Sequence, residues 1–186
     1  MVYSLFCAKS DMFENEDLIV SYGDIIFETK ILEKLINSKA DISVIIDKKW
    51  INLWNKRMDN PLEDAETLKL SKNNHIIEIG KKTDNYKDIQ GQYIGLFKIA
   101  GNKIEAIKKE WEMMDENQIF DGQKLQNIYM TSFLQHLISK GWNIKAVISE
   151  NGWLEVDTEK DLKIYEAMEK ENTLKQLYEI PKHFKI

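Results

Sequence analysis

The chain has 186 residues, 43% of them hydrophobic and 31% charged, which is enough apolar material for one buried core and one domain over residues 1–186. Its formal net charge is −5, and no Lys/Arg cluster alternates with aromatic residues, so a nucleic-acid partner is not expected. The lone Cys7 excludes an internal disulfide, and without a leader pattern or a long apolar run we expect a cytoplasmic protein that has no membrane segment.

Apolar runs with strand character alternate with helical patterns, which is typical of an α/β fold. An amphipathic helix opens the chain and leads into an apolar run that we expect to form a central strand of its sheet. In chain order the expected elements are a helix over 1–10, a strand run over 17–27, a helix over 29–38, strands over 41–47, 75–80 and 93–99, helices over 104–114 and 124–141, two short strands over 143–152 and 153–156 that meet at a turn, and a last helix capped by Thr158 and Asp161.

The stretch from residue 52 to residue 70 is polar and dense in charge, and strand patterns flank it on both sides. Long loops in compact domains are usually functional or disordered, and the apolar residues Trp54, Leu62 and Leu68 argue against disorder. We therefore expect an ordered loop whose charges are mostly structural. Its predicted internal ion pairs join Arg57 to nearby acidic residues, namely Asp59, Glu63, Asp64 and Glu66.

Two carboxylate sites stand where apolar runs end. Asp24 follows one run, and ligands of open α/β sheets bind beyond the carboxyl ends of the strands. Glu155 and Asp157 alternate with Val156, so their side chains point to the same side of the strand. Oxygen ligands arranged in this way suit a hard cation such as Mg2+. Asp24 is also compatible with a plain turn residue, and Asp157 with capping of the last helix.

Two further patterns could contact a ligand. Lys81 and Lys82 end a strand, where a lysine suits a phosphate, although paired lysines are also common on solvated surfaces. Gly91 and Gly95 flank Tyr93, and glycines within a strand mark either a close approach of a ligand or a bulge. The three histidines are isolated from one another and from the cysteine, so neither a zinc site nor a Cys/His nucleophile is expected.

Six segments in this order, over nearly the whole chain, resemble the sugar-nucleotide pyrophosphorylase or nucleotidyltransferase superfamily. The chain is most similar to its small bacterial cytidylyltransferases, the branch that includes phosphocholine cytidylyltransferase and a CDP-glutamine-forming enzyme of capsule phosphoramidate synthesis. The resemblance implies a Rossmann-like (GT-A-like) α/β fold with a mixed sheet flanked by helices. It also implies a Mg2+-dependent reaction in which a small phosphorylated acceptor attacks a nucleoside triphosphate, with CTP the expected nucleotide, and pyrophosphate leaves. The segments are SYGDIIF, NPLEDAETLKL, EIGKK, QGQYIGLFKI, YMTSFLQHLI and WLEVDTEKDL.

Carried over by position, the resemblance makes Asp24 the metal-binding aspartate and Glu155 with Asp157 the second metal-binding element. Family members vary between one aspartate and an acidic pair at this second element, so the contact with the ion stays open between the two. Lys81, or else Lys82, would hold the acceptor phosphate. The remaining residues that the resemblance places at or over the acceptor pocket are Gln92, Tyr93, Arg57 and Glu63.

The sequence departs from the family pattern in its N-terminal part. The family begins with a strand, a glycine-rich loop containing a basic residue, and a further lysine, and none of these is found here. That unit would measure roughly 30 residues or more, so we expect this chain to be inactive or incomplete alone. A complementing N-terminal fragment or a homo-oligomer would then be its protein partner.

Two other functions remain open from the sequence. A GT-A glycosyltransferase would share the fold, although such enzymes usually carry two aspartates one residue apart, and here Tyr22 stands two residues before Asp24. A non-catalytic binding or assembly module of the same fold is the alternative from another class. The identity of the acceptor and the choice of base are not legible in these residues.

Overall fold

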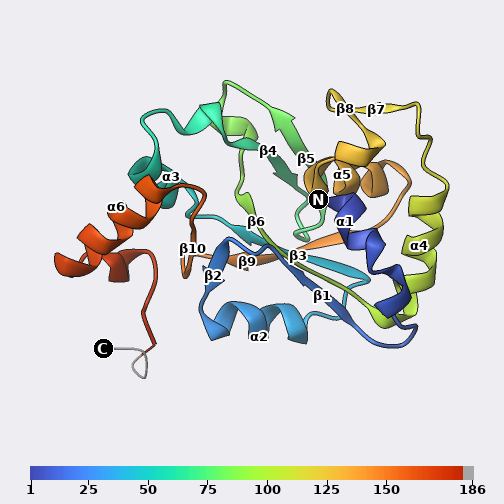
Figure 1. The fold of residues 1–186 in the computed structure, drawn as a ribbon, viewed down its shortest axis with the longest axis horizontal. Coiled ribbons are helices and arrows are strands. Elements are labelled where there is room, and N and C mark those ends of the chain that lie inside the picture. The colour runs from blue at the N-terminus through green and yellow to red at the C-terminus, as the bar shows by residue number, and fades with distance from the viewer. Residues whose placement is uncertain (182–186) are drawn as a thin grey trace.

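The computed structural model describes residues 1–181, and its elements form a mixed α/β arrangement (Figure 1). The helices are α1 (Val2–Cys7), α2 (Thr29–Asn37), α3 (Ile51–Arg57), α4 (Ile104–Glu112), α5 (Met130–Ser139) and α6 (Glu159–Lys170). The strands are β1 (Leu18–Ser21), β2 (Ile25–Phe27), β3 (Ile42–Asp47), β4 (Glu66–Leu70), β5 (Ile76–Lys82), β6 (Gln92–Ile99), β7 (Ile119–Phe120), β8 (Gln123–Lys124), β9 (Ile144–Ser149) and β10 (Trp153–Glu155). Within residues 1–181 no helix is long and apolar enough to span a bilayer.

The main sheet has four strands in the order β1-β6-β3-β9. Strand β6 is antiparallel to both β1 and β3, whereas β3 and β9 run parallel, which makes the sheet mixed. Every residue of β3 is buried, because helices cover both of its faces and the β-branched run ISVII suits such a strand. Two-stranded ribbons accompany this sheet, formed by β2 with β10, β4 with β5, and β7 with β8.

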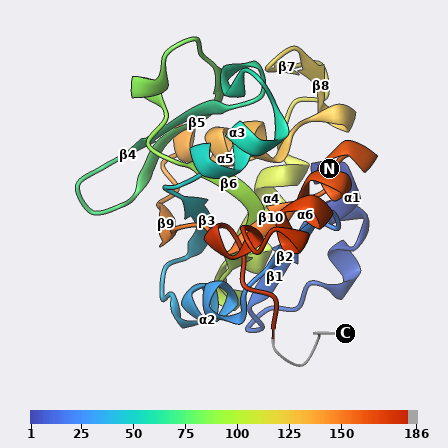
Figure 2. The ribbon, with the colours of Figure 1, turned by 90° about the vertical axis from the view of Figure 1, so that its left-hand side faces the viewer.

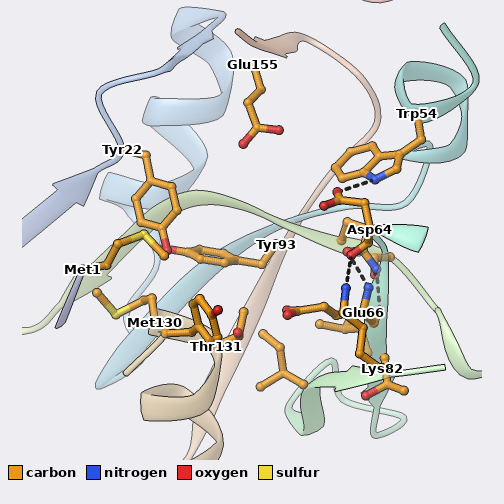
Figure 3. Close-up of a pocket in the computed structure, with 16 residues that line it drawn as sticks. Met1, Tyr22, Trp54, Asp64, Glu66, Lys82, Tyr93, Met130, Thr131 and Glu155 are labelled. Atoms are coloured by element: carbon orange, nitrogen blue, oxygen red, sulfur yellow. Dashed lines mark hydrogen bonds between the residues drawn. The ribbon is translucent and has the colours of Figure 1, made fainter. Parts of the chain in front are cut away.

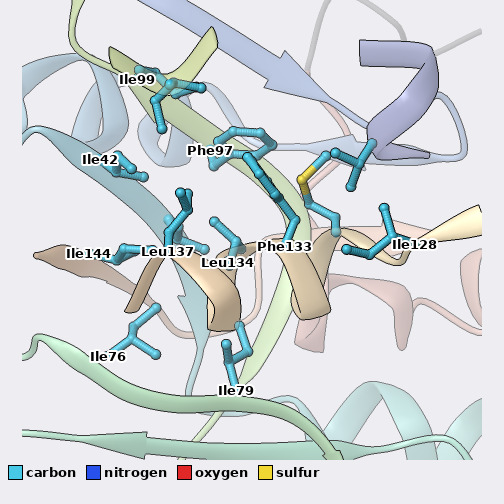
Figure 4. Packing of buried hydrophobic residues seen from close by; sticks show 14 of the residues in the cluster. Ile42, Ile76, Ile79, Phe97, Ile99, Ile128, Phe133, Leu134, Leu137 and Ile144 are labelled. Carbon is cyan, nitrogen blue, oxygen red and sulfur yellow. The ribbon is translucent and has the colours of Figure 1, made fainter. Parts of the chain in front are cut away.

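Alternate residues of β3 feed two separate hydrophobic clusters. Val44 and Ile46 belong to the cluster that contains α5, and Ile45 belongs to the cluster that contains α2, α3 and α6. Figure 4 shows α5 between the main sheet and β5, with Phe133 and Leu137 among its buried residues. Burying each such side chain contributes roughly 1.5–3 kcal/mol, so this packing fixes β5 against the sheet.

Several expected elements differ in extent or pairing from the structure. The first strand run divides into β1 and β2, and among the described strands β1 lies at an edge with Ile19 exposed, so the expectation of a central strand is wrong. The predicted loop over 52–70 contains most of α3 and all of β4. The last two strands do meet at Asn151 and Gly152, both with positive φ, but β9 joins the main sheet and β10 pairs with β2.

Helix α6 begins with the predicted cap. The Thr158 hydroxyl accepts a hydrogen bond from the Asp161 backbone N–H, and the Asp161 carboxylate accepts one from the Thr158 N–H. This capping box places Asp161 in the first turn of α6, facing α3. In Figure 2, α6 lies in front of the β2–β10 ribbon with α3 above it. The C-terminal end of α3 and the N-terminal end of α6 are thereby brought together.

Candidate active site

Pairing of β2 with β10 brings the two predicted carboxylate sites together. The antiparallel register places Glu155 opposite Ile25, the residue that follows Asp24. The backbone N–H of Val156 donates to the Asp24 carbonyl at 2.9 Å, which extends this pairing by one step. One carboxylate oxygen from each of Asp24, Glu155 and Asp157 lies within 4.8 Å of the other two. The three residues that the sequence singled out therefore converge.

These three carboxylates form a donor set that fits a hard divalent cation. All the ligand atoms are oxygens, and Mg2+ or Ca2+ binds such oxygens and completes its shell with water or phosphate oxygens. Asp24 and Asp157 are exposed and Glu155 is half-buried, so an arriving phosphate could share the ion. Soft or nitrogen ligands do not contribute to this cluster in the described part of the chain, which argues against zinc.

Arg57 connects this cluster to helix α6. Its guanidinium donates to Glu155 Oε2 at 2.5 Å, to Asp157 Oδ2, and to Asp161 Oδ1 at 3.1 Å. The side chain is only 3% exposed. The ion pairs predicted within the loop are wrong, because Arg57 ends helix α3 and points toward β10 and α6 instead of back along its own segment.

Opposing effects set the pKa values within this network. Burial raises the pKa of Glu155, and the neighbouring Arg57 guanidinium partly offsets that effect. Burial acts in the same sense on Asp161, but hydrogen bonds from Arg57 and Thr158 prevail and hold its pKa below the usual value. For Arg57, burial disfavours the charged form, yet its bonds to Asp161 and Glu155 raise its pKa overall. The guanidinium therefore stays charged beside the carboxylates.

A cavity of about 380 Å3 lies next to the carboxylate cluster and includes Glu155 in its wall (Figure 3). It is bounded by the ends of β1, β4, β5 and β6, by α3, and by the start of α5. Aromatic and acidic side chains both contribute to the lining. The lining residues include Tyr22, Trp54, Asp64, Glu66, Lys82, Gln92, Tyr93, Thr131 and Glu155.

The two adjacent lysines differ in position because successive side chains of a strand point to opposite faces. Lys82 lines the cavity, and its ammonium donates to the carbonyls of Glu63 and Asp64 at 3.2 and 3.3 Å. Lys81 is not among the lining residues, and its exposed ammonium pairs with Glu78 at 2.8 Å. The structure thus places Lys82, rather than Lys81, beside the cavity.

Two carboxylates of the cavity wall have no cationic partner in the described part of the chain, namely those of Asp64 and Glu66. Asp64 accepts a hydrogen bond from Trp54 Nε1 at 3.0 Å. Glu66 is half-buried, and burial raises the pKa of its carboxyl group while a hydrogen bond from Thr131 opposes the rise. In Figure 3 these carboxylates face the same space as Glu155. The cavity is therefore acidic on this side.

Gln92 and Tyr93 both line the cavity. The Gln92 amide donates to the Glu66 carbonyl at 2.6 Å and accepts from the Glu66 N–H at 3.3 Å, so it holds β4 in place. The Tyr93 ring meets that of Tyr22 edge-on, and burial beside Tyr22 raises the pKa of the Tyr93 hydroxyl.

Gly95 determines where Tyr22 lies. It has φ +83°, and an added Cβ would lie 2.6 Å from Tyr22 Cδ2. The register of β3 and β6 shifts at this point, which confirms the bulge interpretation of this glycine.

We expect Gly95→Ala to destabilise the protein more than Gly122→Ala does. Gly122 has a similar φ of +79° but nothing within 4 Å of an added Cβ, so its replacement tests backbone strain alone. Strain of this kind costs about 1–3 kcal/mol, and Gly95→Ala adds a clash with Tyr22. Urea unfolding of both variants measures the two losses. Equal losses would show that Gly95 does not determine the position of Tyr22.

The remaining predicted site residues lie outside the cavity wall. Arg57 is buried against the carboxylates, and Glu63 is exposed, with its side chain accepting from Asn60. Glu66 and Trp54 could not be predicted as cavity residues, because the dense charge of their segment favours a loop and hides the short strand β4. Pairing of β4 with β5 sets Glu66 opposite Lys82, and only that pairing reveals both as neighbours of the cavity.

Comparison with known proteins gives one curated relative and many structural neighbours. The chain is 46% identical, over 168 residues that make up 88% of its length, to CTP:phosphoglutamine cytidylyltransferase from Campylobacter jejuni. The inositol-1-phosphate CTP transferase from T. maritima superposes on 96% of the chain with a TM-score of 0.62 and 21% identity. A protein from Bacillus anthracis assigned as a glucose-1-phosphate thymidylyltransferase superposes on 97%, with a TM-score of 0.59 and 17% identity.

The chain is shorter than each of these proteins. It spans 66% of the cytidylyltransferase from Campylobacter jejuni, 64% of the T. maritima chain and 62% of the Bacillus anthracis chain. No protein-family model matches it. The two structural neighbours have low sequence identity, and they show that the mixed sheet flanked by helices is the nucleotidyltransferase fold.

Proposed function

Because the chain belongs to the nucleotidyltransferase family that includes CTP:phosphoglutamine cytidylyltransferase, we propose that the protein transfers CMP from CTP to a small phosphorylated acceptor. In this reaction an oxygen of the acceptor phosphate bonds to the α-phosphorus of CTP, the bond from that phosphorus to the bridging oxygen breaks, and pyrophosphate leaves. The observation that carries the proposal is the convergence of Asp24, Glu155 and Asp157 beside an acidic, aromatic cavity.

We assign the binding of a Mg2+ ion to these three carboxylates. When bound there, Mg2+ would neutralise charge that accumulates on the triphosphate oxygens. The acceptor phosphate is already an anion, so no general base is needed, and positioning does most of the work. Lys82 is the proposed partner of the acceptor phosphate. Its ammonium has three N–H donors, and two of them are used by backbone carbonyls.

The acidic side of the cavity supports an acceptor that also bears a positive charge. Among residues 1–181, Asp64, Glu66 and Glu155 line the cavity with one lysine, Lys82, and that lysine is bound to carbonyl oxygens. Two anionic reactants would be repelled by such a wall unless a cation accompanies them. An amino-acid phosphate such as phosphoglutamine carries an ammonium group, which Glu66 can pair with and the neighbouring aromatic rings can accommodate.

Replacing Glu66 with glutamine is expected to raise KM for phosphoglutamine about tenfold or more, since the pair between ammonium and carboxylate is lost. The KM of a des-amino analogue, in which hydrogen replaces the ammonium, should change little. Steady-state kinetics with both acceptors measures this difference. Glu105→Gln on the outer surface of α4 serves as the matched control. Equal effects of Glu66→Gln on both acceptors would contradict the assigned role.

The reaction itself is tested by product analysis. The protein is incubated with CTP, Mg2+ and phosphoglutamine, and phosphorus NMR follows the products. We expect pyrophosphate and a CDP-linked product to appear in equal amounts, both dependent on the acceptor. A glycosyltransferase would instead consume a nucleotide sugar and release a nucleoside diphosphate. Absence of pyrophosphate with every phosphorylated acceptor tried would contradict the proposed function.

A further inference from the structure

The strongest feature that the proposed reaction leaves unexplained is the buried guanidinium of Arg57. It reaches three carboxylates from the end of β10 and the start of α6, about 100 residues further along the chain, and two of them belong to the cluster assigned to Mg2+. A residue that served only to join α3 to α6 would need Asp161 alone. The additional bonds to Glu155 and Asp157 call for another role.

The atoms involved show what this role can be. Arg57 contacts one oxygen of Glu155, Oε2, and one oxygen of Asp157, Oδ2. Each carboxylate keeps its other oxygen, which can bind a cation. Hydrogen bonds to the outer oxygens of ligating carboxylates orient such ligands in many metal sites. The planar guanidinium, with its donors in a fixed fork, can hold two carboxylates at a set separation.

Arg57 itself is held rigidly. Its guanidinium carbon lies 5.9 Å from the centre of the Trp54 ring, one turn earlier in α3. Asp161 binds Nε at 3.1 Å, and Asp161 is in turn fixed by the capping box of α6. The guanidinium therefore takes its position from two helix ends and transmits it to the carboxylates. Without this charge, Asp24, Glu155 and Asp157 would repel one another at close range.

We propose that Arg57 is a positioning residue of the cation site, which holds Glu155 and Asp157 by one oxygen each so that their other oxygens meet Asp24 at the ion. This role differs from the substrate contact that the family resemblance implied for Arg57. It rests on the cation site of the proposed function, but it concerns metal binding and does not depend on the identity of nucleotide or acceptor.

The test compares Arg57→Met with Lys98→Met. Lys98 is also a buried cation, 4% exposed in its side chain and paired with Asp17 at 2.9 Å, but it is not part of the carboxylate cluster. Both variants should melt at lower temperature than the parent. Mn2+ binding, measured by electron paramagnetic resonance well below both melting temperatures, separates them. We expect Arg57→Met to weaken Mn2+ binding about 10–100-fold and Lys98→Met to leave it within about twofold.

Arg57→Lys covers the case in which Arg57→Met fails to fold. Lysine keeps the charge but lacks the fork, so Mn2+ binding should still weaken, by less than in Arg57→Met. Unchanged or tighter Mn2+ binding in the folded arginine variants would overturn the positioning role. Failure of the parent protein to bind Mn2+ would overturn the cation site as well, whereas Mn2+ binding without pyrophosphate release would contradict only the proposed reaction.

Discussion

Replacing Asp24 with alanine is expected to abolish Mg2+-dependent release of pyrophosphate from CTP, with a loss of at least about 100-fold in kcat. Loss of a residue that hydrogen-bonds to a metal ligand commonly lowers metal affinity or activity about 10–100-fold. Asp24 is proposed to bind the ion directly, so its loss should cost at least as much. Asp24 is exposed, and it comes from a different segment than the other two carboxylates. Its loss would leave the ion with ligands on one side only. Coupled pyrophosphate assays over a range of Mg2+ concentrations measure the effect.

The matched control is Asp11→Ala, which removes another exposed aspartate that is not part of the cluster. Because Asp24 is exposed, its replacement should leave the melting temperature of the metal-free protein within a few degrees of the parent. A variant that folds normally and turns over at the parental rate would remove Asp24 from the metal site.

Glu155→Gln is expected to reduce activity at least about 100-fold, and Asp157→Asn only about tenfold. The sequence left open which of the two carboxylates touches the ion. Arg57 binds both, but Glu155 is half-buried and lines the cavity, whereas the Asp157 side chain is 50% exposed. A fixed carboxylate loses less conformational freedom on binding the ion, so Glu155 is the stronger ligand.

Kinetics of both variants at saturating CTP, with the Mg2+ concentration varied, tests this ranking. The apparent KM for Mg2+ should rise in both variants, and more strongly in Glu155→Gln. Thermal unfolding of both variants measures how much stability is lost with the ion pair to Arg57. The reverse order, with Asp157→Asn the more damaging change, would show that the ion binds nearer the N-terminal end of α6 than we propose.

The order of elements could largely be predicted from hydrophobic periodicity, but their partners could not. The apolar run of β3 and the amphipathic pattern of α5 correctly indicated a strand and a helix. The hairpin predicted at Asn151 and Gly152 failed in a specific way. The turn is present, but β9 and β10 pair with strands that lie more than 90 residues earlier. Local turn chemistry is encoded in neighbouring residues, whereas sheet membership depends on distant ones.

The candidate site shows the same difference between features set by neighbouring residues and contacts between distant ones. Asp24, Glu155 and Asp157 could be found from their places at strand ends, but the β2–β10 register that brings them together could not be predicted from the sequence. Arg57 could not be assigned, because its partners lie about 100 positions away and no local pattern joins them. The dense charge in its own segment pointed instead to neighbours in sequence.

The family resemblance was confirmed. The expectation that activity needs an additional N-terminal nucleotide-binding unit stays a prediction. The relative from Campylobacter jejuni is 46% identical over most of this chain, and the chain spans 66% of that protein. Residues described here provide the proposed cation site and acceptor cavity. Whether turnover needs a further segment that grips the triphosphate can be judged from activity assays with and without such a segment.

The central claim is that Asp24, Glu155 and Asp157 bind one divalent cation at the edge of the cavity. Its most direct test is a crystal of the protein soaked with Mn2+ and CTP, from which anomalous diffraction locates the metal. We expect one strong anomalous peak within about 2.0–2.6 Å of oxygens from Asp24 and Glu155, with Arg57 still bound to the outer oxygens. A crystal in which CTP is bound but no anomalous peak lies between these carboxylates would contradict the claim.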